Sequence, residues 1–196
     1  DSFTEHAELI KQLLTINGLL VDRFQLSIDP AFDSYNLIDA SINQLPILTE
    51  ALGRIRARGA AVLSAKNATL QERASIVALI EKANERSEAM HGALAKAILA
   101  NNSIKPKIDG HAKTALESAD KVLKLADVNI VNAETIEFSP IDYVAQVTQA
   151  IDDQLKLNAV AMDALQDILH ARLSNQKNNQ YALLFAIFSL SLFAAW

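Results

Sequence analysis

Apolar residues recur every three or four positions along most of this chain, and this spacing constrains its fold more than any other feature. Only 5 Gly and 4 Pro interrupt the 196 residues, and the residues that dominate (Ala, Leu, Ile, Gln, Glu and Lys) favour helices. No alternating strand pattern competes with the helical one. The sequence therefore predicts an all-α fold, an elongated antiparallel up-down bundle of long helices packed at about 20°.

Five helical stretches are expected, and local signals mark several of their starts. The stretches are, approximately, 3–27, 34–66, 69–100, 111–132 and 139 onward. Thr69 and Glu72 have the spacing of a capping box, in which the two residues satisfy each other's amides. Ser139 precedes Pro140, a pairing typical of a helix start. Asp33 is expected to be the N-cap of the second helix, where its carboxylate would meet free N–H groups.

The apolar seams of these helices predict which residues form the core. In the first helix the seam consists of Leu9, Leu13, Ile16, Leu20 and Phe24. In the second it consists of Leu37, Leu45, Leu48, Leu52, Ile55 and Val62. In the last helix it consists of Val144, Ile151, Leu155, Met162, Leu165, Leu169 and Leu173, with Asn158 on the same seam as a polar residue that sets register.

Two interruptions decide how many legs the bundle has. Pro46 lies inside the second helix and predicts a bend near 43–46. The segment NNSIKPKIDG at 101–110 either kinks the chain or reverses it. If a membrane helix precedes residue 1, the legs between the two membrane segments must be even in number. We therefore expect a kink at 101–110 and four legs; the alternative is a hairpin with a further helix upstream.

The segment 181–196, YALLFAIFSLSLFAAW, contains no charged residue. It is apolar on every face, and Tyr181 and Trp196 resemble the aromatic residues of a membrane interface. A membrane span needs about 20 apolar residues. We expect 1–178 to be a helical-bundle domain and 179–196 to be the start or most of a transmembrane helix that continues the last leg. The alternative is a buried C-terminal helix.

Charge and composition exclude several classes of function. The formal net charge is −5, so the basic surface of a nucleic-acid-binding protein is absent. With no Cys, disulfides and thiolate metal sites are excluded. Glu88 with His91, and Asp167 with His170, have the spacing of helical metal ligands, but no clear inward-facing Glu accompanies them. No catalytic motif is recognisable. We expect neither an enzyme nor a cofactor or metal.

Residues 29–63 resemble an element of bacterial transmembrane receptors. The shared pattern is Asp-Pro, Asp-Ser-Tyr, Asp, Leu-Pro and Leu-Gly-Arg-hydrophobic-Arg. It falls on Asp29, Pro30, Asp33, Ser34, Tyr35, Asp39, Leu45, Pro46, Leu52, Gly53, Arg54, Ile55 and Arg56. The element is similar to one in the extracytoplasmic sensor regions of methyl-accepting chemotaxis receptors and of related sensor kinases and diguanylate cyclases.

The resemblance implies a ligand-binding helical bundle, usually dimeric, on the periplasmic or extracellular side of the bacterial inner (cell) membrane. Such a domain would bind a small molecule or a periplasmic binding protein and would pass a conformational signal through the last helix into the membrane. The alternative, from another class, is a structural or partner-docking helical stalk of a membrane protein that has no small ligand.

The densest positive charge in this acidic chain predicts a ligand site. Arg54, Arg56 and Arg58 occupy five positions between two Gly, and guanidinium groups bind carboxylates in a bidentate manner. A small organic anion, most simply a carboxylate, is the expected ligand. The alternative is a solvated helix face with a few ion pairs. Tyr35 and Asp39 are the second choice, because they share one face near the start of the second helix.

Overall fold

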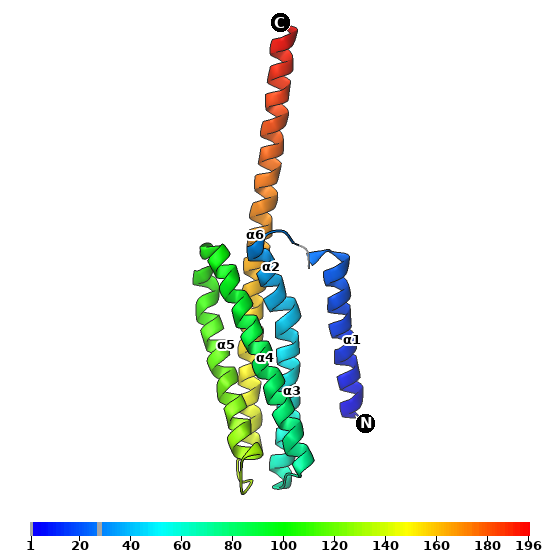
Figure 1. Cartoon of the computed structure of the whole chain (residues 1–196), viewed down its shortest axis with the longest axis vertical. Helices are drawn as coiled ribbons and strands as arrows, with labels where there is room; N and C mark the ends of the chain where they lie inside the picture. Colours follow the sequence, from blue (N-terminus) through cyan, green and yellow to red (C-terminus); the bar gives the residue numbers. More distant parts are fainter. Residues whose placement is uncertain (1, 27–28) are drawn as a thin grey trace.

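The computed structural model describes the backbone of residues 2–26 and 29–196, and the side chains of these residues except 2–4, 6–7 and 194–195. Its elements in order are α1 (Ser2–Arg23), α2 (Phe32–Ile38), the π-helix η2 (Asp39–Gln44), α3 (Leu45–Ala65), α4 (Leu70–Ala100), the 3-10 turn η3 (Asn102–Ile104), α5 (Lys105–Ala126), the π-helix η4 (Asp127–Val131) and α6 (Pro140–Ala195). Because α2, η2 and α3 follow one another without a gap, the described residues form five helical legs packed antiparallel (Figure 1). The predicted all-α bundle is confirmed.

The chain reverses direction between α4 and α5, so the kink expected at 101–110 is wrong (Figure 1). Asn101 has an extended backbone, with φ −143° and ψ 90°, and it ends α4. Pro106 lies in the first turn of α5, where no intrahelical partner would use its amide hydrogen. Pro106 therefore begins a helix instead of bending one, and the bundle has five legs where four were expected.

Two of the predicted helix starts are confirmed. The amide of Glu72 donates to Thr69 Oγ1 at 3.2 Å, and the amide of Thr69 donates to Glu72 Oε2 at 2.8 Å, which completes the capping box of α4. At the start of α6, the amide of Asp142 donates to Ser139 Oγ at 3.3 Å. These local bonds satisfy amides that the helix itself cannot pair.

The second leg begins differently from the prediction. The N-cap of α2 is Ala31, so the expected N-cap role of Asp33 is wrong, and Asp33 lies within the first turn. The amide of Ala31 donates instead to Asp29 Oδ1, at 2.9 Å, which sets the turn one step earlier in the chain. Near Pro46, where a bend is predicted, the structure has the π-helix η2, and α3 then starts with Pro46 in its first turn.

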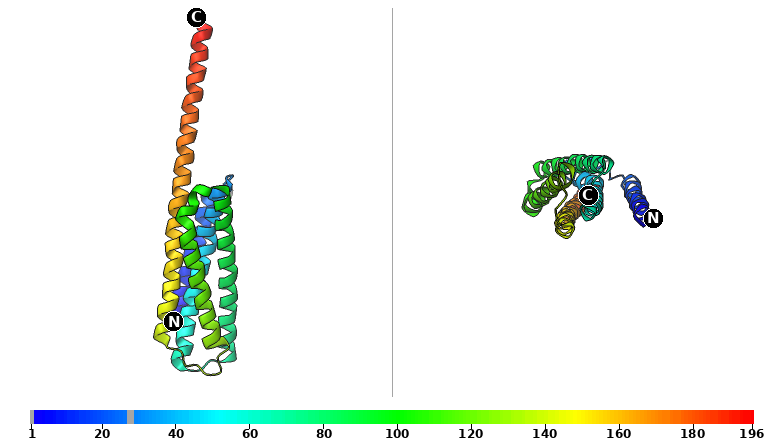
Figure 2. Two further views of the ribbon diagram at one scale, coloured as in Figure 1. Left: turned by 90° about the vertical axis from the view of Figure 1, so that its left-hand side faces the viewer. Right: turned by 90° about the horizontal axis from the view of Figure 1, so that it is seen from below.

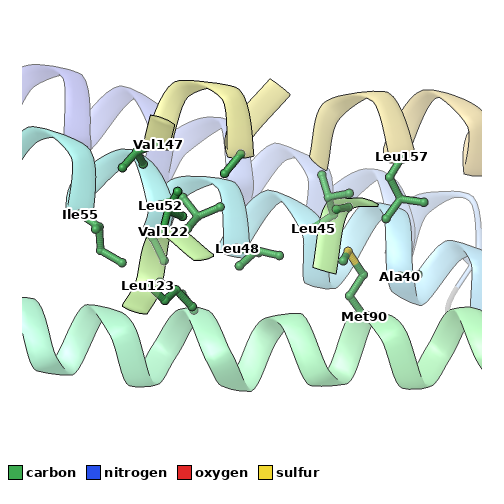
Figure 3. Packing of buried hydrophobic residues seen from close by; sticks show 14 of the residues in the cluster. Ala40, Leu45, Leu48, Leu52, Ile55, Met90, Val122, Leu123, Val147 and Leu157 are labelled. Atoms are coloured by element: carbon green, nitrogen blue, oxygen red, sulfur yellow. The ribbon is translucent and has the colours of Figure 1, made fainter. Parts of the chain in front are cut away.

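The core of the bundle is a layer of aliphatic side chains shared by α3, α4, α5 and α6 (Figure 3). The predicted seam of the second leg is confirmed, since all of its members are at most 3% exposed: Leu37, Leu45, Leu48, Leu52, Ile55 and Val62. Met90 of α4 and Val122 of α5 pack into the same cluster. Regular apolar spacing on one helix face was therefore sufficient to locate this part of the core.

The long helix α6 has two apolar faces, and the predicted seam lies partly on each, since Ile151 and Leu169 pack against the core. The buried face consists of Tyr143, Val147, Ala150, Gln154, Leu157, Ala161, Ala164 and Ile168. Of the predicted seam, Leu165 is buried, whereas Val144, Leu155, Met162 and Leu173 are 37% to 56% exposed. The inner face is rich in Ala, which lets helices approach closely but contributes little to an apolar pattern. We call the exposed residues Val144, Leu155 and Met162, with the half-buried Ile151, the outer stripe of α6.

The predicted seam of α1 also faces outward. Leu9, Leu13, Ile16, Leu20 and Phe24 are 46% to 68% exposed. Val21, which is 5% exposed, lies on the side that contacts η2 and α3. α1 ends at Arg23, and Gln25 adopts a positive φ of 55° that stops the helix before the expected end at 27. Residues 27 and 28 lie outside the described part of the chain.

α6 is a single helix of 56 residues that extends well beyond the end of the other legs (Figure 2). Its predicted continuity past residue 178 is confirmed. The side chains of Leu183, Leu184, Phe185 and Phe188 on this extension are 61% to 73% exposed. Among the described residues, no helix has the length and apolar character needed to cross a membrane.

Candidate functional site

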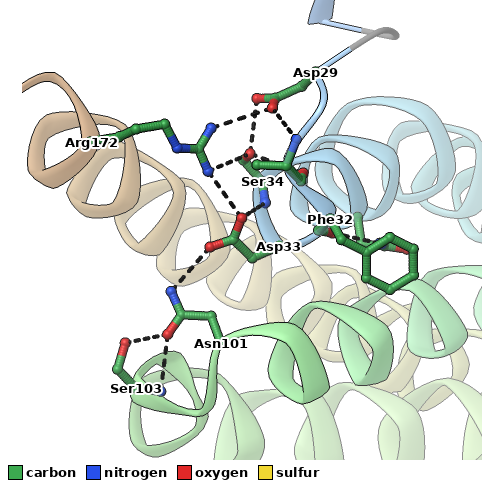
Figure 4. Close-up of polar contacts among 9 residues, drawn as sticks. Asp29, Phe32, Asp33, Ser34, Asn101, Ser103 and Arg172 are labelled. Atoms are coloured by element: carbon green, nitrogen blue, oxygen red, sulfur yellow. Dashed lines mark hydrogen bonds and ion pairs between the residues drawn. The ribbon is translucent and has the colours of Figure 1, made fainter. Parts of the chain in front are cut away.

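The two Asp residues of the Asp-Pro and Asp-Ser-Tyr motifs converge on one arginine of α6 (Figure 4). Arg172 Nη2 donates to Asp33 Oδ1 at 3.0 Å and to Ser34 Oγ at 3.1 Å. Arg172 Nη1 donates to Asp29 Oδ1 at 3.3 Å. One guanidinium thus holds the connector before α2, the first turn of α2 and α6 together. We call Asp29, Asp33, Ser34 and Arg172 the arginine cluster.

The turn between α4 and α5 joins the same cluster. Asn101 Nδ2 donates to the second carboxylate oxygen of Asp33 at 3.1 Å. Asn101 Oδ1 in turn accepts from the amide of Ser103 at 3.2 Å, which fixes the turn (Figure 4). Three legs of the bundle therefore meet through polar side chains at the end from which α6 leaves it.

A local hydrogen bond helps to place these groups. Asp29 Oδ2 accepts from Ser34 Oγ at 2.8 Å, which folds the connector back over the first turn of α2. Both carboxylates are mostly buried, with side chains 12% exposed for Asp29 and 17% for Asp33, whereas that of Arg172 is 38% exposed. Partial burial strengthens the ion pairs relative to surface pairs, because water and salt screen them less.

The arginine cluster is suited to fixing the position of α6, since charge-assisted and planar contacts are strong and directional. Beyond Arg172, the outer part of α6 no longer packs on the other legs, and every described side chain from Leu173 onward is exposed. A displacement of α6 relative to α2 must therefore stretch or break the contacts of this guanidinium.

The three arginines predicted as a ligand site lie along α3, each in its own surroundings. Arg54 Nε donates to Glu50 Oε1 at 2.5 Å, a pair one helical turn apart. Arg56 Nη1 donates to Thr148 Oγ1 of α6 at 2.9 Å. Arg58 is exposed. Their role in binding an anion is untested and stays a prediction.

The second predicted pair, Tyr35 and Asp39, lies on the second leg. Tyr35 is 41% exposed. Asp39 Oδ1 accepts from Asn43 Nδ2 and Gln44 Nε2, both at 3.1 Å, within the π-helical segment η2. Asp39 therefore supports this local irregularity, and its contact with a ligand also stays a prediction.

Arg172 is the residue that sequence reasoning missed. It lies seven positions after Leu165, on a heptad position where the pattern predicts an apolar residue. A charge at such a position is the signal that could have drawn attention to it, since a buried seam tolerates a charge only with a partner. Its partners are 139 and 143 positions earlier in the chain, and nothing in a single sequence pairs them.

The two candidate metal pairs lie on different helices, Glu88 and His91 on α4 and Asp167 and His170 on α6. Asp167 of α6 accepts from Lys107 Nζ of α5 in an exposed ion pair. His91 of α4 is half-buried, and burial lowers its pKa while the nearby Asp120 opposes that shift. Within the described part of the chain, no three His, Asp or Glu side chains are placed to hold a metal ion.

Comparisons of this chain with protein-family models, with curated proteins and with solved structures give no match. The structure shows an all-helical bundle of five legs, and no family is identified.

Proposed function

We propose that this chain is the extracytoplasmic sensor region of a bacterial transmembrane receptor, and that it transmits a ligand-dependent displacement along α6. The observation that carries the proposal is the continuity of α6. This one helix of 56 residues packs in the core through Ile168, is held by Arg172, and continues into the apolar segment 181–196. A continuous helix passes a displacement at its packed end to its free end.

The resemblance of residues 29–63 to bacterial sensor regions also supports the proposal. The polar part of that motif, Asp29, Asp33 and Ser34, contacts α6 through Arg172. A motif that holds the transmitting helix is understandable in a receptor, where the helix must have a defined resting position. No catalysis is part of this proposal, and its ligand is a small molecule or a periplasmic binding protein.

The proposed setting is the inner membrane of a bacterium, with the bundle on the periplasmic side. The segment 181–196 would begin the membrane anchor, and flotation with vesicles of phosphatidylethanolamine and phosphatidylglycerol tests this. We expect the chain to float with vesicles and the double variant Ile187→Glu with Phe188→Glu to remain at the bottom. Leu99→Glu, at a side chain of α4 that is 85% exposed, is the control and should still float. Equal flotation of all three would contradict the anchor.

We also propose a homodimer, formed by the outward apolar faces of α1 and α6. The outer stripe of α6 and the exposed seam of α1 both have heptad-like spacing, the pattern of helices that pair with further helices. Sedimentation should detect a dimer that Leu13→Glu weakens. A monomer at every concentration would contradict this part of the proposal.

Transmission can be measured directly because the chain contains no Cys. Spin labels on Asn102→Cys in η3 and Gln176→Cys in α6 report how α6 sits against the bundle end, and labels on Lys121→Cys and Ala145→Cys report the bundle itself. A ligand from a panel of metabolites, carboxylates included, should raise the melting temperature. At 100 times its dissociation constant it stabilises by about 2.7 kcal/mol.

A stabilising ligand should shift the distance distribution of the 102–176 pair and leave that of the 121–145 pair unchanged. If every stabilising ligand leaves both pairs unchanged, transmission along α6 is contradicted. If no compound in the panel binds, the result favours the alternative of a helical stalk that docks a protein partner, which the exposed apolar seam of α1 would suit.

A further inference from the structure

A groove of about 390 Å³ lies between α1, η2 and α6. Val21 of α1 and Phe24, just after α1, form one wall, Ser41 and Ile42 of η2 a second, and Met162 of α6 a third. This volume is within the range of small-molecule sites, about 300 to 1,000 Å³. The groove is separate from the arginines of α3 and from the arginine cluster, none of which lines it.

The lining of the groove is uncharged. Ten residues form it, and none of them is Asp, Glu, Lys, Arg or His. The net charge of the chain is −5, and charged side chains make up 21% of it, but none of them lines the groove. A ligand that carried a charge would lose hydration here without gaining a partner of opposite charge.

The side chains of Asn17, Ser41 and Asn158 are the polar part of this apolar lining, and two of their oxygens lack a hydrogen-bond partner among the described residues. They are Ser41 Oγ, in a residue that is 4% exposed, and Asn158 Oδ1 of α6. Both oxygens are covered by protein atoms, so a ligand would reach them after a χ1 rotation of Ser41 or a flip of the Asn158 amide. An unsatisfied buried hydroxyl costs free energy, which a ligand could recover.

The backbone at this wall is also unusual. Ser41 and Ile42 belong to the π-helical segment η2, and such segments occur frequently at functional sites. They lie in the same stretch of the sequence, 27–46, whose clustered Asp and Pro residues interrupt the helical pattern. One wall of the groove therefore combines an irregular backbone with the unpartnered hydroxyl of Ser41.

We infer that this groove binds a small, neutral, mostly apolar molecule with one hydrogen-bonding group, which contacts Ser41 and Asn158. Such a molecule would touch both α1 and α6 and would fix their relative position. The inference rests on the proposed sensor function, and it adds the chemical class of the ligand. It differs from the organic anion expected at Arg54, Arg56 and Arg58.

Two matched dyes test the chemical class. N-phenyl-1-naphthylamine is neutral, mostly apolar and has one N–H donor; 8-anilino-1-naphthalenesulfonate has the same aromatic frame with a sulfonate. Both fluoresce on leaving water. We expect the neutral dye to bind the full chain at least about tenfold more tightly, because the groove offers no cation to the sulfonate. Tighter binding of the sulfonate would overturn the inference.

Two matched variants test the location. Met162→Lys places a charge in the groove and should weaken binding of the neutral dye at least about tenfold. Leu155→Lys introduces the same charge seven residues earlier on the outer stripe, outside the groove, and should leave the affinity for the neutral dye unchanged. Binding of dye to the apolar segment 181–196 is common to both variants and cancels in the comparison. Equal weakening by both, together with loss of a dimer in sedimentation, would assign the groove to a second copy of this chain and overturn the inference.

Ser41→Ala separates a ligand contact from a packing role. Removing the unsatisfied hydroxyl should leave the melting temperature unchanged or raise it, while the affinity for the neutral dye falls several-fold. If affinity stays unchanged, Ser41 does not contact the dye and the inference is contradicted. Failure of any of these tests leaves the 102–176 distance measurement as an independent test of the sensor function.

Discussion

Arg172 Nη2 of α6 lies 3.0 Å from Asp33 Oδ1 of α2, across 139 positions of the chain. The same guanidinium reaches Asp29, and Asp33 also accepts a hydrogen bond from Asn101 in the turn between α4 and α5. α2 and the turn between α4 and α5 lie at the end of the bundle from which α6 departs (Figure 1). The arginine cluster therefore holds α6 at the point where this helix leaves the bundle, next to the end of the apolar core.

Removing the guanidinium should destabilise the bundle. Arg172→Gln leaves two mostly buried carboxylates without their cation, so we expect the free energy of unfolding to fall by about 1–2 kcal/mol. The difference should shrink in 1 M salt, which screens partly exposed ion pairs. Urea denaturation at low and high salt measures both effects. Arg58→Gln, at an exposed arginine of α3, is the matched control and should change stability by less than about 0.5 kcal/mol.

A double-mutant cycle of Arg172→Gln with Asp33→Asn should give a coupling free energy of about 1 kcal/mol, whereas Arg58→Gln with Asp33→Asn should give none. Additive effects of the first pair would mean that the contact seen between Arg172 and Asp33 contributes nothing in solution.

Gly59 of α3 should not tolerate even a methyl group. A Cβ added at Gly59 would lie 2.3 Å from the hydroxyl oxygen of Tyr143, in α6, which donates to the carbonyl of Ile55 at 3.0 Å. Because Tyr143 is fully buried, its ring cannot move aside without loss of packing. Gly59→Ala should therefore lower the free energy of unfolding by about 1–3 kcal/mol, although Ala favours helices.

Gly53 provides the matched control on the same helix. A Cβ at Gly53 would meet nothing within 4 Å, so Gly53→Ala should stabilise the protein by about 0.5–1 kcal/mol through helix propensity alone. Thermal denaturation of the two variants compares them directly. Stabilisation by both substitutions would show that α3 and α6 approach less closely than the structure has them.

The sequence was sufficient for features that depend on neighbouring residues. The capping box of Thr69 and Glu72 and the seam of the second leg follow from spacing within one helix, and both are confirmed. The sequence does not predict the hairpin at 101–104, because a Pro fits a kink and a helix start equally well, and only the packing of α5 on α6 decides between them.

The parts that could not be predicted depend on contacts between distant residues. α6 has apolar residues on two faces, and the buried one is recognisable only from its fit to partners, such as Tyr143 over Gly59. The local sequence around Asp33 predicts a cap, but its carboxylate pairs with Arg172 and Asn101 instead. The ligand site at Arg54, Arg56 and Arg58 stays a prediction. A high density of charge in the sequence does not establish that the three side chains converge in space.

The capping box of α4 should be visible in the titration of Glu72. Hydrogen bonds from the amide and the hydroxyl of Thr69 lower the pKa of Glu72. Thr69→Ala should raise that pKa toward its usual value, as NMR titration can show, and should cost about 1 kcal/mol at neutral pH. Thr114→Ala, an exposed change inside α5, should be neutral or slightly stabilising. An unchanged Glu72 titration would contradict the box.

His91 should make the stability of the bundle depend on pH near neutrality. Burial between α4 and α5 lowers the pKa of His91 below its usual value of about 6.5, and the carboxylate of Asp120 partly opposes this. The unfolded chain therefore takes up the proton at a higher pH than the folded chain does. Stability from the neutral imidazole is fully present above about pH 6.5 and is lost as pH falls toward the lowered pKa, with a slope of up to about 1.4 kcal/mol per pH unit.

Urea denaturation at pH 7.5 and 5.5 measures this loss, which His91→Gln should reduce. His111→Gln, at an exposed position of α5, removes a histidine elsewhere and should retain the full loss.

Asp120→Asn should lower the pKa of His91 further in an NMR titration, because the carboxylate that favours the imidazolium is gone. If the wild type and His91→Gln lose the same stability between the two pH values, His91 is not held neutral by burial, and the packing of α4 on α5 at this position is looser than the structure has it.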